Sequence, residues 1–206
     1  MAHKFDVRKA ELLDSPDRLQ ILNPDTILDK LGLNRETMFA DLGCGTGYFS
    51  LPAALRVSKV YALDVQEKML EILQNKIKKE KIKNIDIILS RESSIPLPDN
   101  SIDILFMANV FHELQDKKSI LSEAKRILSS GGKLTIIDWK KMEMDFGPPL
   151  GERLTEDEVV SACKNNGFEI LEKAEAGPYN YILIFKVRKN SQVDKDRINI
   201  DCIYIN

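Results

Sequence analysis

The sequence predicts an α/β fold built on a doubly wound, mostly parallel sheet of seven strands. Apolar runs of strand length alternate with segments of helical periodicity, a pattern typical of strands joined by crossover helices. The first run leads into a glycine-rich turn at residues 43–47. The last two runs are separated only by the short segment around Gly177-Pro178. A parallel pair needs a longer crossover, so we expect one strand near the C-terminal end to be antiparallel.

Two short helices should precede the first strand. Ser15-Pro16 and Asn23-Pro24 each place an N-cap residue before a proline at the first helical position. Gly32 then supplies a C-terminal stop. We therefore interpret residues 1–32 as a helical lead-in, which could also fold over a site as a lid.

The main domain is predicted to span residues 33–188. A long helix is expected near 66–80, where Met69, Leu70, Leu73 and Ile77 lie on one face. Further helices should follow Gly47, run near 117–129 until Gly131-Gly132, and run near 156–166, where Thr155 and Glu158 form a capping box. The strands are expected at about 37–42, 59–64, 85–89, 102–107, 133–138, 168–174 and 180–187. Residues 189–206 read as a tail or an extra edge strand.

Composition narrows the class of protein. A chain of 206 residues with 43% hydrophobic and 30% charged residues is typical of one soluble domain with a real core. The net charge of −2 gives no strong signal for nucleic acid. No apolar run approaches the ~18 residues of a membrane span, and the N-terminus lacks the apolar core of a signal peptide. The oligomeric state stays open.

Cysteine usage favours a reducing cytoplasm. Cys44, Cys163 and Cys202 are few, odd in number and far apart. They form neither a disulfide framework nor a C-x-x-C metal pair, so no metal site is expected.

The glycine-rich turn carries the strongest functional signal. Asp41 ends the first apolar run, and Gly43, Gly45 and Gly47 follow at alternate positions before a segment that can start a helix. A strand, a tight glycine turn and a helix N-terminus bring backbone against nucleotide-like ligands. The third glycine comes one residue too early for the dinucleotide fingerprint G-x-G-x-x-G.

The run Asp41-Leu42-Gly43-Cys44-Gly45-Thr46-Gly47 resembles the cofactor-binding motif of class I S-adenosylmethionine-dependent methyltransferases. The resemblance covers about residues 20–187. It implies a Rossmann-like methyltransferase fold and S-adenosylmethionine as cofactor, with S-adenosylhomocysteine as product. A glycine-rich turn that binds nothing is the alternative.

Further cofactor contacts are expected at the carboxyl ends of the next strands. Asp64 follows Gly43 by 21 residues, a distance that suits hydrogen bonds to ribose hydroxyls, although it could instead be a helix N-cap. Val65 could lie against the adenine. After the third strand, Glu92 is the best acceptor for the adenine amino group, with Ser93 beside it, but Glu92 could equally be an exposed loop residue.

The resemblance places the stretch around Asn109 beside the sulfonium and the methyl group. His112 follows shortly after, where an acceptor would approach, and is the candidate general base. A histidine that only packs and hydrogen-bonds is the alternative. Trp139 could form an acceptor wall or anchor the core. His3 and Phe5 are candidates for the lid.

The acceptor is less defined than the cofactor. The loop after the fourth strand lacks the Asn- or Asp-Pro-Pro-Tyr motif that enzymes methylating amino groups of bases or glutamine often carry. Residues 96–103, Pro-Leu-Pro-Asp-Asn-Ser-Ile-Asp, resemble small-molecule methyltransferases of the quinone and sterol type. We therefore predict methyl transfer to a small molecule. A methyltransferase acting on RNA or protein, and a nucleotide-binding module without transfer activity, remain as alternatives.

Overall fold

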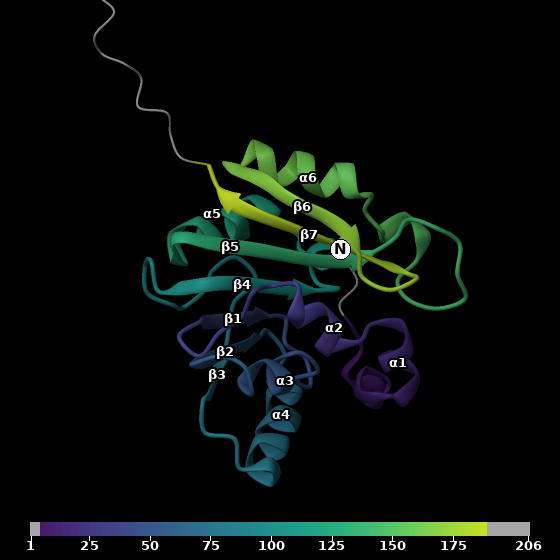
Figure 1. Cartoon of the computed structure of the whole chain (residues 1–206). Coiled ribbons are helices and arrows are strands. Elements are labelled where there is room, and N and C mark those ends of the chain that lie inside the picture. The colour runs from purple at the N-terminus through teal and green to yellow at the C-terminus, as the bar shows by residue number, and fades with distance from the viewer. Residues whose placement is uncertain (1–4, 189–206) are drawn as a thin grey trace, which may run out of the picture.

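The computed structural model describes residues 5–188 and contains one seven-stranded sheet of strand order β3-β2-β1-β4-β5-β7-β6 (Figure 1). Strands β1 to β5 pair in parallel, and β7 is antiparallel to both β5 and β6. This confirms the predicted class and the antiparallel strand near the end. The strands are β1 (Met38–Leu42), β2 (Lys59–Asp64), β3 (Ile85–Leu89), β4 (Ile102–Ala108), β5 (Leu128–Trp139), β6 (Phe168–Glu175) and β7 (Asn180–Val187).

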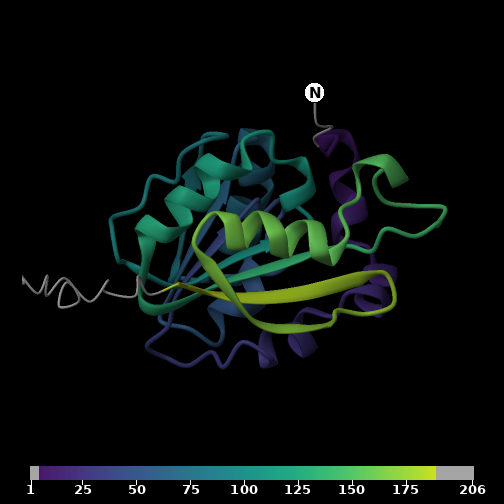
Figure 2. The same cartoon turned by 90° about the horizontal axis from the view of Figure 1, so that it is seen from above.

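Helices cover both faces of this sheet, as the view from above shows (Figure 2). Apolar residues of α2, α3 and α4 pack on one face, and those of α5 and α6 pack on the other. The helical elements are η1 (Val7–Asp14), α1 (Pro16–Ile21), α2 (Pro24–Asp29), α3 (Ser50–Ala54), α4 (Glu67–Glu80), η2 (Phe111–Glu113), α5 (Lys117–Ile127), η3 (Leu150–Glu152) and α6 (Glu156–Asn165).

Local sequence signals explain several helix starts. Prolines occupy the first position of α1 and α2, as predicted, and Asn23 Oδ1 accepts a hydrogen bond from Thr26 N at 3.2 Å. At α6 the capping box is complete, with Thr155 and Glu158 bonding to each other's backbone N–H. The 3-10 helix η1 was not predicted; it is capped by the Asp6 carboxylate, which accepts from Arg8 N.

The predicted boundary between the fifth helix and fifth strand was wrong. Helix α5 ends at Ile127, and the glycine pair lies inside β5 instead of ending the helix. Leu128 pairs with Ile102, and the register shifts before Lys133 pairs with Ile104. A Cβ on Gly132 would lie 3.0 Å from the carbonyl oxygens of Ile102 and Ser129, so glycine permits this irregular pairing.

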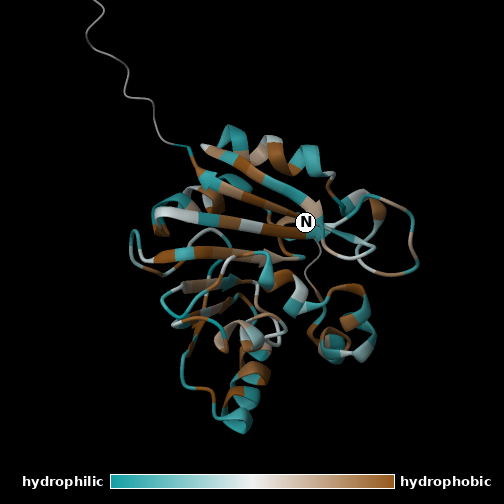
Figure 3. Cartoon of the chain, in the orientation of Figure 1, coloured by the Kyte–Doolittle hydropathy of each residue, from teal (hydrophilic) through white to brown (hydrophobic). Residues whose placement is uncertain are grey.

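The core lies in the central strands. In Figure 3 much of β4 is brown, whereas the helices alternate between apolar and polar stripes. Strand β4 is buried along most of its length, as a strand covered on both faces should be. No helix within residues 5–188 is long and apolar enough to cross a membrane. The predictions for His3, Cys202 and the segment 189–206 concern residues outside the described range.

Candidate active site

The glycine turn lies between β1 and β2 and is shaped by close packing. Gly43, Gly45 and Gly47 all have positive φ angles, of 75°, 54° and 88°. A Cβ on Gly43 would lie 2.3 Å from Val110 Cγ2, and one on Gly47 would lie 2.3 Å from Leu73 Cδ1. A side chain at either position would therefore clash with the structure and strain the backbone. The turn is held in contact with the loop after β4.

Asp64 connects the glycine turn to the start of α4. Its Oδ2 accepts from Gly45 N at 2.9 Å, and its Oδ1 accepts from Gln66 N at 2.8 Å. The residue is 6% exposed. The N-cap of α4 is Gln66, so the alternative interpretation of Asp64 as the helix N-cap was wrong.

Asp41 and Cys44 are buried beneath the turn. Asp41 Oδ2 accepts from Ser50 Oγ at 2.6 Å, which ties β1 to α3. Burial raises the pKa of Asp41 to about 7, with the Ser50 hydrogen bond opposing the shift and the charge of Asp64 adding to it. Burial likewise raises the pKa of the Cys44 thiol well above its ordinary value. The thiol is therefore neutral and unsuited to act as a nucleophile.

The predicted adenine residues lie at the carboxyl ends of β2 and β3. Val65 is 37% exposed, and Glu92 and Ser93 are exposed in the loop after β3. Sequence reasoning missed Ser90, whose N–H donates to the Asp64 carbonyl at 2.9 Å. The Ser90 hydroxyl is buried and has no hydrogen-bond partner among the described residues. A small polar residue directly after an apolar strand was the signal that could have identified it.

Asn109 has an unusual conformation for a side-chain-bearing residue. Its φ is 59°, its N–H donates to Ile137 O at 2.8 Å, and its Oδ1 accepts from Asn180 Nδ2 at 2.8 Å. Asn180 is fully buried at the start of β7 and was not predicted from the sequence. The positive φ turns the chain out of β4 and leads into η2, which carries His112.

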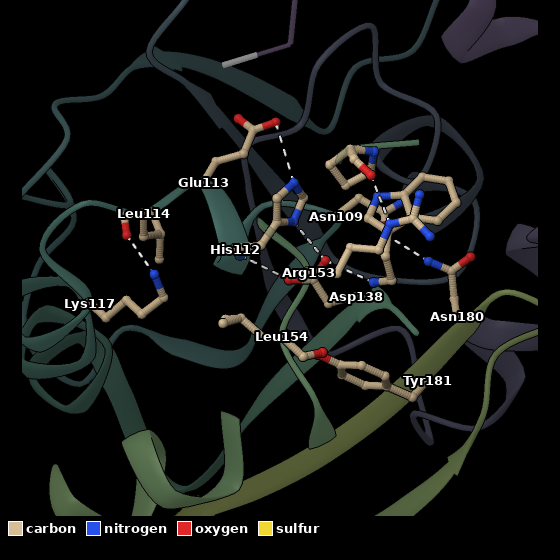
Figure 4. A network of polar contacts seen from close by, with 12 residues as sticks. Asn109, His112, Glu113, Leu114, Lys117, Asp138, Arg153, Leu154, Asn180 and Tyr181 are labelled. Atoms are coloured by element: carbon tan, nitrogen blue, oxygen red, sulfur yellow. Dashed lines mark hydrogen bonds and ion pairs between the residues drawn. The ribbon is translucent and has the colours of Figure 1, made fainter. Parts of the chain in front are cut away.

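His112 is held by a buried carboxylate from the neighbouring strand (Figure 4). Its Nδ1 lies 2.7 Å from Oδ1 of Asp138, and its N–H donates to Oδ2 of Asp138 at 2.9 Å. Burial alone would lower the pKa of His112, but the hydrogen bond and charge of Asp138, with the charges of Glu113 and Glu152, produce a net rise. Sequence reasoning did not assign Asp138 a role.

An aromatic cluster begins at Trp139, the residue after Asp138. Trp139 and Phe146 meet edge-on with ring centroids 6.0 Å apart, and Phe146 meets Tyr179 at 4.8 Å. Trp139 is half-buried, and Phe146 is 40% exposed. The buried Arg153 holds the intervening loop from below, because its guanidinium donates to the carbonyl oxygens of Met142, Phe146 and Pro148.

The N-terminal segment crosses the same edge of the sheet. The Phe5 carbonyl accepts from Gln66 Nε2 at 3.2 Å, and the Phe5 backbone also hydrogen-bonds Glu113. At the other end of the segment, Asp14 accepts from Thr46 Oγ1 at 2.9 Å and pairs with Lys76 at 2.6 Å. Residues 5–14 thus bridge the glycine turn, the start of α4 and η2.

These features gather at the carboxyl ends of the parallel strands, where open α/β sheets bind their ligands. A surface hollow of about 320 Å³ lined by Thr37, Asp103 and Lys133 lies instead at the opposite edge, where the strands begin. Within residues 5–188, no group of three or more His, Cys, Asp or Glu could hold a metal ion. The fold and the site are those of the α/β proteins that bind nucleotide-like ligands beyond the carboxyl ends of their strands.

Comparisons with known proteins identify the family. A protein-family model described as a methyltransferase domain matches residues 40–136. A crystallised S-adenosylmethionine-dependent methyltransferase from Aquifex aeolicus is 38% identical, with a TM-score of 0.85 over 88% of this chain and 98% of that one. The chain belongs to the S-adenosylmethionine-dependent methyltransferases, and S-adenosylmethionine is its cofactor.

Curated relatives share a narrower name. The demethylmenaquinone methyltransferase of Listeria welshimeri is 30% identical over 109 residues, which are 52% of this chain and 46% of that protein. The demethylmenaquinone methyltransferase of a Geobacillus strain is 25% identical over 114 residues, 54% of this chain and 49% of that protein. The chain spans about half the length of the curated relatives it matches.

The residues at the site fit this cofactor. The glycine turn leaves no room for side chains against Val110 and Leu73, so its backbone carries no side chain at Gly43 or Gly47 that would keep a ligand away. Asp64 is an anionic acceptor of the kind that ribose hydroxyls bind. The unpartnered buried hydroxyl of Ser90 lies one hydrogen bond away from the Asp64 backbone and offers a further polar contact.

Proposed function

We propose that this chain transfers the methyl group of S-adenosylmethionine to a small apolar acceptor of the quinone type. The aromatic cluster Trp139, Phe146 and Tyr179, which begins at the residue after Asp138, carries the proposal together with the His112–Asp138 pair. When bound, the cofactor supplies an electrophilic methyl group on a positively charged sulfur. The protein must then align the acceptor with that methyl group, and alignment can account for much of the rate.

Several residues are proposed to bind the cofactor. Asp64 holds the ribose hydroxyls, and Val65, Glu92 and Ser93 surround the adenine. Asn109 contacts the region of the methyl group. The turn itself, with Asp41 beneath it, presents its backbone to the methionine part; it comprises Gly43, Cys44, Gly45 and Gly47. Asp41 acts through Ser50 and the position of β1, since both oxygens are buried.

The loop after β5 supports an apolar acceptor. Met142, Phe146 and Leu150 are exposed to 43%, 40% and 38%, which is a high density of exposed apolar side chains for one loop. Arg153 donates hydrogen bonds to backbone carbonyls of this loop, which fixes the backbone that carries these side chains. The curated relatives named demethylmenaquinone methyltransferase agree with an acceptor of this kind.

His112 is proposed as the catalytic base, since its imidazole lies beside the loop that contacts the glycine turn. Residues 5–14 are proposed as a lid over the cofactor, because they bridge both sides of the site. The two described cysteines, Cys44 and Cys163, are free thiols, which agrees with a reducing cytoplasm.

Calorimetry followed by an acceptor screen tests the proposal. The full chain should bind S-adenosylmethionine, and NAD⁺ should not compete. Ligand at a hundredfold excess over its Kd should stabilise the protein by ~2.7 kcal/mol, which raises Tm by several degrees. Formation of S-adenosylhomocysteine is then measured with a naphthohydroquinone, with total RNA and with a protein fraction. Turnover with RNA or protein alone would overturn the small-molecule acceptor, and binding without any turnover would indicate a module without transfer activity.

A further inference from the structure

The Asp138 carboxylate is fully engaged in orienting His112. Its Oδ1 meets His112 Nδ1 at 2.7 Å and also accepts from Trp139 N at 2.9 Å, while its Oδ2 accepts from His112 N at 2.9 Å. Asp138 is 1% exposed and His112 is 8% exposed. Asp138 therefore fixes both the backbone N–H and one ring nitrogen of His112, although it lies 26 residues further along the chain.

This arrangement selects one tautomer of His112. An ionised carboxylate can only accept hydrogen bonds, so the nitrogen that faces Asp138 must carry the proton. Nε2 is then the basic nitrogen of the neutral ring. Glu113 Oε1 lies 3.9 Å from Nε2, which is too long for a hydrogen bond. The structure thus leaves Nε2 available to accept a proton.

The charges around the ring set its working pH range. Asp138 on β5, Glu113 on η2 and Glu152 on η3 face His112 and favour its charged form against burial. Lys117 on α5 faces Asp138. Burial raises the pKa of Glu113 to about 7, with the charge of His112 opposing and those of Asp138 and Asp64 adding to the rise. Neutral His112 is needed to accept a proton, so turnover should increase with pH through its raised pKa.

We propose that Asp138 is the positioning residue that makes His112 Nε2 a base, and that the methyl acceptor belongs to the class that must lose a proton from a hydroxyl group or a ring carbon. The inference rests on the proposed function. The acceptor proton moves to Nε2, and the electron pair of the broken O–H or C–H bond forms the bond to the methyl carbon. The pair of the broken carbon–sulfur bond stays on sulfur.

The variant Asp138→Asn separates this role from a merely structural one. Both oxygens of Asp138 accept hydrogen bonds, whereas an amide has one oxygen that accepts and one NH₂ group that donates. In whichever position the NH₂ group lies, it faces an N–H group that it cannot bond. The loss of negative charge also lowers the pKa of His112. We therefore expect the acid limb of the pH–rate profile to move to lower pH, and kcat to fall ~10²-fold or more while the Kd of S-adenosylmethionine stays unchanged.

Nuclear magnetic resonance provides a readout that does not need turnover. Two-bond ¹H–¹⁵N correlation spectra of the full chain distinguish the two histidine tautomers and titrate His112 directly. Wild-type protein should show the Nδ1–H form above the His112 pKa, and Asp138→Asn should lower that pKa and admit the Nε2–H form. An Nε2–H form in the wild type, or an unchanged tautomer and pKa in Asp138→Asn, would overturn the positioning role even if that variant folds poorly.

A matched control is available at the other end of the sheet. Asp103 also accepts from a backbone N–H, that of Met38 at 2.8 Å, and from a hydroxyl, that of Ser129 at 2.8 Å. Asp103→Asn should therefore show how much stability is lost when such a carboxylate becomes an amide. The His112 spectrum and the pH–rate profile should stay unchanged in this variant. If it shifts both as Asp138→Asn does, the positioning role is wrong.

Acceptor probes test the substrate class separately. A naphthohydroquinone, a primary amine and a thiol are supplied to the wild type and to Asp138→Asn. Methylation of the hydroquinone in the wild type, strongly reduced in the variant, supports the class. Methylation of the amine or thiol alone overturns it. If the wild type does not bind S-adenosylmethionine by calorimetry, the proposed function fails, whereas the tautomer result still decides the role of Asp138.

Discussion

The two sides of the site are built in different ways. The cofactor side comes from one short stretch of chain, the turn after β1, together with Asp64 from the adjacent β2. The acceptor side combines η2, the end of β5 and the loop pinned by Arg153, which are far apart in sequence. The cofactor side uses backbone groups at glycine positions, whereas the acceptor side uses side chains whose protonation depends on neighbouring charges. Binding and chemistry should therefore be separable by mutation.

The variant His112→Ala should break the acceptor side alone, with the largest effect. General-base catalysis contributes ~10²–10⁴-fold, so kcat should fall by that factor. The Kd of S-adenosylmethionine, measured by calorimetry, should change less than about twofold, because the ring contacts Asp138 and not the turn. Added imidazole should restore part of the turnover. Full activity in the variant would remove His112 from the mechanism.

Asp64→Ala should break the cofactor side alone. Hydrogen bonds to a charged group contribute ~1.5–3 kcal/mol, so the Kd of S-adenosylmethionine should rise about 10- to 100-fold. At saturating cofactor, kcat should be much less affected. Asp99→Ala is the control, since that aspartate pairs with Arg126 far from the turn. An unchanged Kd in Asp64→Ala would show that the ribose assignment is wrong.

Gly43→Ala tests whether the two sides are physically coupled. The new Cβ would lie 2.3 Å from Val110 Cγ2 at a φ of 75°, so the free energy of unfolding should fall by ~2–4 kcal/mol. The displaced Val110 precedes η2, so kcat and the Kd should both worsen, by roughly tenfold. Gly151→Ala, with open space at its Cβ position, should change none of these three quantities. Thermal melts measure the stability, calorimetry measures the Kd, and formation of S-adenosylhomocysteine measures kcat.

Each side also contains one carboxyl with a pKa of about 7, namely Asp41 and Glu113. A raised pKa means that the folded state binds a proton that the unfolded state releases. The resulting stability is present below pH ~4 and is lost as pH rises through 7. We expect Tm to fall by a few degrees between pH 5 and pH 8, and to fall less in Asp41→Asn and in Glu113→Gln. Equal slopes in all three proteins would contradict these pKa values.

The sequence was most informative where a motif is local. The alternate glycines, the acid at Asp41 and the partner Asp64 identified the turn, because backbone geometry there depends on consecutive residues. The fold followed from alternating periodicities for the same reason. The end of α5 was misplaced because glycine usually stops a helix, whereas Gly131-Gly132 here accommodate an irregular strand pairing.

The acceptor side could be predicted only in part. His112 was proposed from its place after β4. Its partner Asp138, and the partner Asn180 of Asn109, come from strands much further along the chain and reach the site only through strand pairing. Ser90 was overlooked because a lone serine carries no spacing signal. Such contacts depend on register and packing, which a single sequence leaves undetermined.

Arg153 has a consequence for how readily this enzyme could change its preference for acceptors. Arg153 is 3% exposed, and its guanidinium holds the loop after β5 through three main-chain oxygens, which are present whatever side chains the loop carries. Substitutions at Met142, Phe146 or Leu150 can therefore resculpt the mouth while its scaffold persists. In evolutionary terms, a loop backbone held in place by Arg153 would let the apolar side chains of that loop change.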